Sequence, residues 1–337
     1  MFYFPVMPKR SGSCMVLLIV LLFAGQAAAQ NDTLYVKSYY TNLVPRLMTN
    51  FKIHSTSFVT RSDTSFSSDC FSTGGQNFLG AEVSYKWATL GYSFGFDKSN
   101  APTNTDLRLS TSFQPFRIYL NYTSLKNLNY YRVNGTEDET DTVFNSWQNT
   151  IELRNVGIKV DYIANNKKFY YSSSLSQVGR QLKSQGSFIV SSGISYQDFD
   201  LRGLPDSASS GFMKLYSADQ FKTVKADLGV GYAYNWVLTK KLVIYVSEIP
   251  NIGFQQTQLF EQASAKRHST VSLTNYFRAG VIYTWKNKFL GAYAYNSVTT
   301  GKWTGYHYNS TYTSLQLHFG MILDGPEKYL HRKRTES

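Results

Sequence analysis

The feature that most constrains this chain is a strict two-residue alternation between large apolar side chains and small or polar ones. It runs through Ala81 to Trp87, Leu90 to Phe96, Leu228 to Trp236 and Leu315 to Leu323. Because successive side chains of a strand point to opposite faces, each segment is predicted to be a strand with one aromatic, apolar face and one small or polar face.

The small or polar face distinguishes two β architectures. A soluble sandwich needs many charges on its outer faces, whereas here the second face is often Gly, Ser or Ala. The chain has 26 Tyr, 23 Phe and 23 Gly but only 17% charged residues, a composition that favours β-structure. We therefore predict an all-β fold, a single antiparallel transmembrane β-barrel with bulky side chains toward lipid.

The alternation predicts twelve strands, and the connections between them are alternately long and short. We expect the long links outside the cell and the short turns in the periplasm. The predicted strands are Pro45 to Thr60, Asn77 to Trp87, Thr89 to Asp97, Asp106 to Gln114, Phe116 to Ser124, Ile151 to Ile163, Lys167 to Gln177, Thr223 to Val237, Lys241 to Gln255, Ser269 to Trp285, Phe289 to Thr299 and Thr311 to Leu323.

One segment, Gly186 to Tyr196, also has strand character but gives an odd strand number. We place it in a long outer excursion from Val178 to Phe221, folded into the lumen. If it spans instead, a boundary elsewhere is wrong and the barrel has up to fourteen strands. Two further outer loops are predicted, the Ser-rich and Thr-rich Ser62 to Gln76 and the acidic Asn134 to Asp141. The acidic loop is either a solvated loop or a surface that binds a cation or partner.

The N-terminus has the pattern of a secretory signal peptide. Lys9 and Arg10 precede an apolar run from Met15 to Ala24, and an A-x-A cleavage site ends at Ala29. The run is too short to span a membrane as a helix. We divide the chain into a signal peptide (1–29), an N-terminal periplasmic segment (30–44), the barrel (45–323) and a basic tail (324–337). Cleavage would leave Cys70 as the single cysteine, so no internal disulfide is expected.

Three tryptophans mark one predicted membrane interface. Trp87, Trp236 and Trp285 each end a strand just before a short turn, as in an aromatic girdle. Lysines follow in the same turns, although β-proteins in general place Lys in turns.

Charged residues on the small or polar face are predicted to point into the lumen. With +12 overall, the chain is basic, and the lumen set indicates a mildly cationic interior. The alternative is that these charges pair with Asp161 and Asp227 and fill a closed barrel. The predicted lumen residues are Glu82, Arg108, Arg117, Lys159, Lys225 and His318.

Catalytic, cofactor and metal sites are not predicted. The five histidines show no metal-ligand spacing, and no nucleophile elbow, phosphate loop or dinucleotide motif is present. A remote alternative is a barrel-wall lipid hydrolase that uses Ser314 and His318. Both residues lie on the predicted lumen face, so we expect no enzyme.

Two segments carry a family resemblance: GGQNFLGAEVSYKWATLGYSFGF (Gly74 to Phe96) and YIANNKKFYYSSSLSQVGRQLKSQGSF (Tyr162 to Phe188). They resemble the Bacteroidetes-type cell-envelope family known as domain of unknown function 4421, over nearly all of the chain after the signal peptide. The resemblance implies an outer-membrane location and supplies no activity or site residues.

The leading functional hypothesis is a porin-like, passive or gated path for small solutes in the bacterial outer membrane. The alternative is a plugged barrel that acts as a scaffold or binds a partner or glycan at the cell surface. The expected partners are outer-membrane lipid and the barrel-insertion machinery, with no cofactor and no nucleic acid. The oligomeric state does not follow from the sequence.

Overall fold

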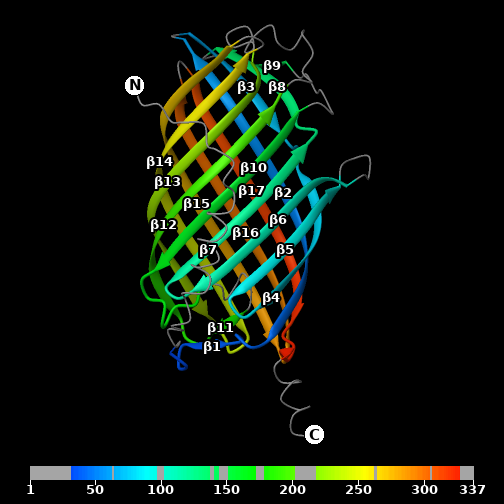
Figure 1. Cartoon of the computed structure of the whole chain (residues 1–337), viewed down its shortest axis with the longest axis vertical. Helices are drawn as coiled ribbons and strands as arrows, with labels where there is room; N and C mark the ends of the chain where they lie inside the picture. The colour runs from blue at the N-terminus through cyan, green and yellow to red at the C-terminus, as the bar shows by residue number, and fades with distance from the viewer. Residues whose placement is uncertain are drawn as a thin grey trace, which may run out of the picture. The chain divides into compact units, whose positions relative to one another are not determined.

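The computed structural model describes residues 32–62, 64–96, 102–136, 140–143, 151–171, 178–201, 218–261, 264–303 and 306–326. Twelve of its strands form one antiparallel barrel, which closes where the last strand pairs with the first of the twelve (Figure 1). These are β2 (Leu43–Arg61), β4 (Gln76–Tyr85), β5 (Ala88–Phe96), β6 (Pro102–Phe113), β7 (Phe116–Lys126), β10 (Glu152–Ile163), β12 (Gln185–Asp200), β13 (Ala218–Val237), β14 (Leu242–Glu261), β15 (Ser264–Trp285), β16 (Lys288–Trp303) and β17 (Tyr306–Met321).

The alternation in the sequence separates the two faces of the barrel wall. On β12 and β13, Phe188, Leu228 and Val230 are exposed on the outside, whereas Ser191 and Asn235 on the same strands are completely buried inside. Because closure pairs every strand with two neighbours, this apolar outer surface can contact lipid without unpaired backbone groups. The predicted fold class is confirmed: the chain is an outer-membrane type β-barrel.

Two of the predicted strand assignments are wrong, and their errors cancel in the strand count. Gly186 to Tyr196 is not a lumen segment but part of the spanning strand β12, which pairs with β10 and β13. Lys167 to Gln177 is not a strand: residues 164–171 form a turn and a short irregular segment, and 172–177 lie outside the described residues. Both segments alternate, but Phe169 and Tyr171 are buried inside the barrel rather than facing lipid.

The two ends of the barrel differ. At one end, which we call the turn end, short turns join β4 to β5, β6 to β7, β13 to β14 and β15 to β16, and the barrel also begins and ends there. We assign this end to the periplasm. At the opposite end, the loop end, pairing of β14 with β15 continues to Glu261 and Ser264, and pairing of β16 with β17 to Trp303 and Tyr306. Long strands therefore replace two of the predicted long outer loops.

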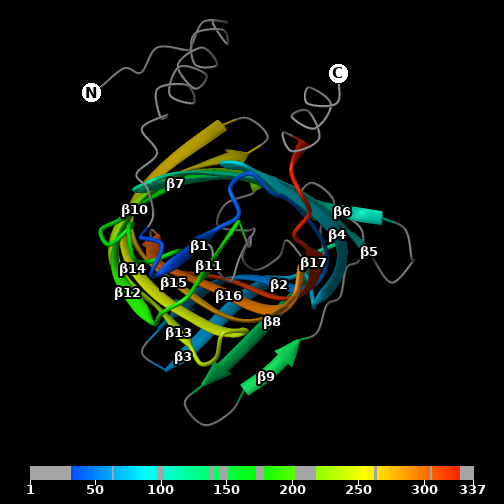
Figure 2. The ribbon, with the colours of Figure 1, turned by 90° about the horizontal axis from the view of Figure 1, so that it is seen from below.

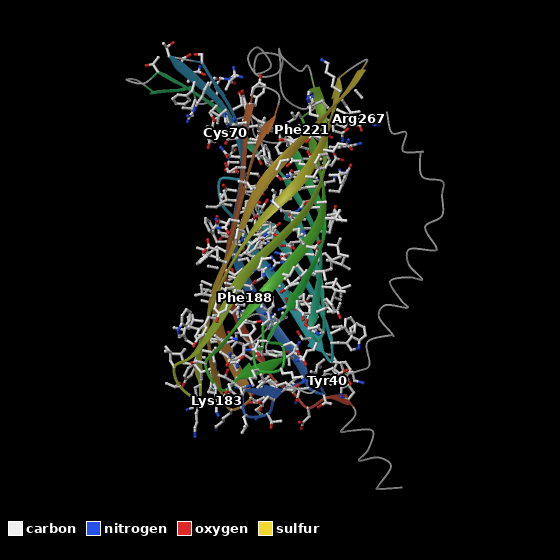
Figure 3. All side chains as sticks on the ribbon, turned by 90° about the vertical axis from the view of Figure 1, so that its left-hand side faces the viewer. Tyr40, Cys70, Lys183, Phe188, Phe221 and Arg267 are labelled. Carbon is white, nitrogen blue, oxygen red and sulfur yellow. The ribbon has the colours of Figure 1, made fainter. Side chains whose placement is uncertain are left out.

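Three additional strands form an outer leaf at the loop end. They are β3 (Ser65–Ser72), β8 (Asn129–Thr136) and β9 (Thr140–Val143), which extend the sheet from the end of β2. The leaf projects away from the barrel, with Cys70 near its base (Figure 3). The predicted loops Ser62 to Gln76 and Asn134 to Asp141 thus contain strands, since β3 pairs with β2 and β8, and β8 pairs with β9. Phe71 of β3 is completely buried.

A short two-stranded sheet lies at the turn end. It consists of β1 (Val36–Ser38) and β11 (Gly179–Gln181), and Figure 2 shows both lying across the lower opening of the barrel. No helix among the described residues is long and apolar enough to span a membrane. The predicted signal peptide lies outside the described residues, as does the basic tail from residue 327 onward.

Candidate functional site

The lumen is the candidate functional site, and its inward side chains form three successive layers. An apolar layer lies toward the loop end, further apolar side chains lie toward the turn end, and charged and tyrosine side chains lie between them. The middle layer surrounds a cavity of about 370 Å³, which we call the chamber. A volume of this size is within the range of small-molecule sites, roughly 300–1,000 Å³.

Aromatic rings pack together in the lumen at the loop end. Phe199 on β12 and Phe221 on β13 stack with ring centroids 4.6 Å apart, and Phe58 on β2 packs edge-on against Phe221 at 5.8 Å. Phe71 from the outer leaf packs edge-on against Phe199 at 5.1 Å. We call this layer the outer aromatic cluster; its buried members are Phe58, Phe71, Phe78, Leu125, Leu128, Tyr130, Ile151, Leu153, Phe199, Leu201, Phe221, Leu259, Tyr306 and Tyr308.

At the turn end, a segment that is not part of the wall enters the lumen. Residues 164–171, which follow β10, place Phe169 and Tyr171 against Ile189 and Tyr245 of the wall. The rings of Tyr171 and Tyr245 meet edge-on at 5.9 Å. We call residues 164–171 the inner plug. Because its apolar contacts are made by a connecting segment, withdrawing it would leave the hydrogen bonds between barrel strands intact.

Gln181 on β11 connects the inner plug to the N-terminal segment. Its amide nitrogen donates to the carbonyls of Tyr35 at 3.2 Å and Lys168 at 2.7 Å, and its amide oxygen accepts from the backbone of Tyr170 at 2.8 Å. The Asn235 amide of β13 donates to the same oxygen at 3.2 Å. Gln181 is completely buried, so these bonds form without competition from water.

Charged residues of β2 and β6 form one ionic group on the chamber wall. Lys52 pairs with Oδ2 of Asp106, and Arg108 donates to the same oxygen at 2.8 Å and to Oδ1 at 3.2 Å. The Lys52 ammonium also lies 3.8 Å from the centroid of the Phe78 ring. Two cations therefore share one carboxylate, and the group carries one excess positive charge.

A second ionic group lies on β10, β13 and β15. Lys159 is 3.9 Å from Asp161, and Arg278 is 3.6 Å from the same carboxylate. Lys225 is 3.2 Å from Asp227, which also accepts a hydrogen bond from the Tyr276 hydroxyl at 3.0 Å. Three cations here share two carboxylates.

The predicted lumen residues occupy different places. Glu82, Arg108, Arg117, Lys159 and Lys225 line the chamber. Glu82 pairs with Arg46 of β2, and the Arg117 guanidinium lies 4.4 Å from the centroid of the Tyr119 ring. His318 is buried nearer the turn end, where its ring meets that of Phe289 at 6.0 Å.

The predicted girdle residues all lie at the turn end: Trp236 and Trp285 at the ends of β13 and β15, and Trp87 in the turn between β4 and β5. Trp87 stacks on Phe113 with ring centroids 5.5 Å apart, Trp285 lies 5.7 Å from Tyr283, and the exposed Trp236 lies 4.7 Å from Tyr234. Trp236 and Trp285 each contact a tyrosine two residues earlier on the same strand, whereas Trp87 contacts a residue at the end of β6.

Sequence reasoning missed the chamber residues Arg46, Asp106 and Arg278, and also Lys52, which pairs with Asp106. Each lies on the small or polar face of a strand, so the two-residue alternation could have predicted that its side chain points into the lumen. The alternation does not predict which of these residues contact one another across the lumen.

Three solved structures illustrate the likeness to known proteins. The outer membrane protease OmpT from Escherichia coli matches with 9% identity and a TM-score of 0.38, covering 84% of this chain and 97% of that one. OmpT, an outer membrane protein of Vibrio cholerae, matches with 8% identity and a TM-score of 0.30, covering 87% and 99%. A bacterial polysaccharide outer membrane secretin matches with 10% identity and a TM-score of 0.33, covering 83% and 98%. Likeness at this level carries no argument about activity.

A search of the curated proteins finds no match. A family model does match, and it spans residues 30–321, from before β1 to the end of β17. The chain belongs to the family described as domain of unknown function DUF4421.

Proposed function

We propose that the barrel provides a gated path for small polar solutes across the outer membrane. The observation that carries this proposal is the contrast between the chamber and its two ends. Charged, hydroxyl and tyrosine side chains line the chamber, whereas clusters of apolar side chains pack in the lumen on both sides of it. A cavity of about 370 Å³ between these clusters is large enough to hold a small solute.

The inner plug is the proposed gate. Phe169 packs on the wall through its apolar ring, and Tyr171 packs on Tyr245 and donates its hydroxyl hydrogen to Asp161 at 3.1 Å. Gln181 fixes the position of the plug through hydrogen bonds to Lys168 and Tyr170. A segment that acts as a gate must be able to open locally while the rest of the protein stays folded, so gates are found among the less stable parts of a structure. Residues 164–171 meet this condition because they form no barrel strand.

A second candidate function is a plugged barrel that presents a binding surface outside the cell. The outer leaf favours it, since β3, β8 and β9 project beyond the wall where a partner or glycan could reach them (Figure 2). The leaf is tied together by Asp69, which accepts hydrogen bonds from Tyr130 at 2.6 Å and Arg132 at 2.7 Å.

We also propose that the protein is not an enzyme. The residues considered for a barrel-wall lipid hydrolase, Ser314 and His318, are both buried on the lumen side of β17. Neither can approach a lipid chain on the outer surface without leaving the wall. A hydrolysis assay on phospholipid vesicles should give equal rates for the wild type and for a Ser314→Ala variant.

Single-channel recording tests the gated path. The full chain is reconstituted in planar lipid bilayers beside a Phe169→Ala/Tyr171→Ala double variant. We expect brief, rare openings of the wild type and sustained conductance of the double variant, because the substitutions remove the two rings of the inner plug. A matched control is Phe188→Ala/Tyr232→Ala, which removes two outward rings that contact each other at 5.2 Å.

The control pair should conduct like the wild type. If neither the wild type nor the inner-plug variant conducts at any voltage, the barrel is not a path and the plugged scaffold is favoured.

A further inference from the structure

The chamber holds more positive than negative charge, and two ionic groups on its wall each carry one excess positive charge. The β2 and β6 group contains Lys52 and Arg108 against Asp106. The second group contains three cations against two carboxylates, namely Lys159, Lys225 and Arg278 against Asp161 and Asp227. Arg46 and Glu82 balance each other, and Arg117 adds a further positive charge to the cavity wall.

Lys159 is the least satisfied cation of the second group. Its ammonium is 3.9 Å from Asp161, beyond hydrogen-bond distance, and no hydrogen-bond partner for this nitrogen is found among the described residues. It lies 3.6 Å from the centroid of the Tyr276 ring, and its side chain is 14% exposed. An ammonium buried without hydrogen bonds is costly, because the attraction of a ring does not replace its three lost bonds to water.

The neighbouring carboxylates already have other partners. The Asp161 carboxylate faces Arg278 and accepts from the Tyr171 hydroxyl at 3.1 Å, and Asp227 faces Lys225. These contacts use Oδ2 of each carboxylate, whereas Oδ1 of Asp161, the atom nearest Lys159, accepts no hydrogen bond from the described residues. That oxygen can satisfy only one of the three donors of the Lys159 ammonium. A ligand with its own negative charge would supply the missing contact.

Arg108 provides the corresponding donor in the first group. Its side chain is 32% exposed and lines the chamber, whereas the side chains of Lys52 and Asp106 are 3% and 2% exposed. Because Lys52 already neutralises Asp106, the Arg108 guanidinium can donate to a second acceptor in the cavity. A guanidinium has five N–H donors and suits a carboxylate.

Tyrosine rings line the wall between the two groups. Tyr276, Tyr295 and Tyr312 follow one another on β15, β16 and β17, with neighbouring ring centroids 6.4 Å and 5.7 Å apart. All three line the chamber together with Lys159 and Arg108. Such a wall offers apolar ring faces to a short carbon skeleton and hydroxyls to its polar substituents.

We propose that the chamber binds a small organic dianion of the dicarboxylate class, with one carboxylate at the Lys159 ammonium and the other at the Arg108 guanidinium. Two separate excess charges favour two separate anionic groups over a single one. The inference rests on the proposed function for the route by which the ligand enters, but binding itself is tested independently.

Calorimetric titration of the detergent-solubilised full chain at low salt tests the proposal, with succinate and acetate as probes. Succinate should bind at least about tenfold more tightly than acetate, because only a dianion engages both cations. Lys159→Met should weaken succinate binding by about tenfold or more and leave the acetate affinity less affected. Lys126→Met is the matched control, since Lys126 pairs with Glu152 at 3.1 Å and does not line the chamber.

Equal affinities for succinate and acetate would overturn the proposal, and this comparison requires no variant. Equal effects of Lys159→Met and Lys126→Met would also overturn it. A Phe169→Ala variant, which keeps the Tyr171 hydroxyl on Asp161, is titrated in parallel so that a closed gate cannot hide the site, and absence of succinate binding to both proteins counts against the proposal.

Failure of this proposal is distinguishable from failure of the gated path. Conductance without succinate binding would retain the path and reject the dianion site. Succinate binding without conductance would retain the site and indicate a barrel that holds its ligand.

Discussion

Lys52 and Asp106 form a buried ion pair between β2 and β6, two strands that are separated in the barrel by β4 and β5. The pair therefore joins positions of the wall that share no backbone hydrogen bonds. Arg108 is bound to the same carboxylate, so Asp106 is the centre of the group. Asp106 is therefore expected to contribute more to stability than Lys52.

We predict that Asp106→Asn destabilises the barrel more than Lys52→Met. Removing the carboxylate leaves two cations uncompensated in the wall, a loss in the range of about 3–5 kcal/mol for a broken buried pair. Lys52→Met leaves the Arg108 pair intact and replaces the ammonium with an apolar end next to Phe78. Urea unfolding of both variants in lipid vesicles measures the difference, and a larger loss for Lys52→Met would contradict it.

For Glu248 we predict that a substitution stabilises the barrel, in contrast to the substitutions at Lys52 and Asp106. It lies on the outer face of β14 between the apolar Val246 and Ile252, where it accepts a hydrogen bond from Asn275 at 2.9 Å. A carboxylate that faces lipid lowers stability, by less than the ~2–4 kcal/mol of an Arg or Lys at the bilayer midplane. Glu248→Leu should therefore raise the urea midpoint of unfolding.

Glu82→Leu is the matched control for Glu248→Leu. The same substitution on the inner face removes the partner of Arg46 and should lower the urea midpoint. Shifts in the same direction for both variants would mean that Glu248 does not face lipid.

Tyr130 in the outer leaf should lose its proton only at unusually high pH. Its burial and its hydrogen bond to Asp69 raise the pKa of this phenol above the ordinary value of 10. Since the folded pKa is the higher one, the leaf is fully stabilised below about pH 10 and loses that stability as the pH rises further. The difference in ultraviolet absorbance between wild type and Tyr130→Phe gives the midpoint, and a value at or below 10 would rule out the buried hydrogen bond.

Gln181→Ala should loosen the turn end without unfolding the barrel. Each buried group left without a partner costs about 1–3 kcal/mol, which corresponds to roughly 5- to 150-fold faster local hydrogen exchange. We expect the effect at the amide of Tyr39, which donates to Val178 at 2.7 Å, and at the amide of Leu182, which donates to Tyr35 at 2.7 Å.

Gln185→Ala is the control for Gln181→Ala. Its amide donates only weakly to the adjacent Gly186 carbonyl, at 3.3 Å, and it lies at the same end of the barrel. Exchange that rises equally in both variants would show that Gln181 does not hold the plug in place.

The sequence was sufficient for the barrel and for the inward direction of the charges predicted in the lumen, because these depend on a two-residue period. The strand number was correct because two wrong assignments cancelled. The sequence was insufficient at Lys167 to Gln177, where Phe169 and Tyr171 alternate as a strand does but face the lumen. Alternation reveals two unlike faces, and it does not reveal which of them meets lipid. The pairing of Lys52 with Asp106 could not be predicted from the sequence either, because it depends on the stagger of the strands around the closed barrel.

The most direct test of the account is whether the inner plug controls access to the chamber. Ser195, which lines the chamber, is changed to Cys in a Cys70→Ser background, and a membrane-impermeant thiol reagent is applied from the turn end of the reconstituted barrel. With the plug intact we predict slow modification, and with Phe169→Ala/Tyr171→Ala added we predict a rate at least about tenfold higher. Equal rates in the two proteins, whether fast or slow, would contradict the gate.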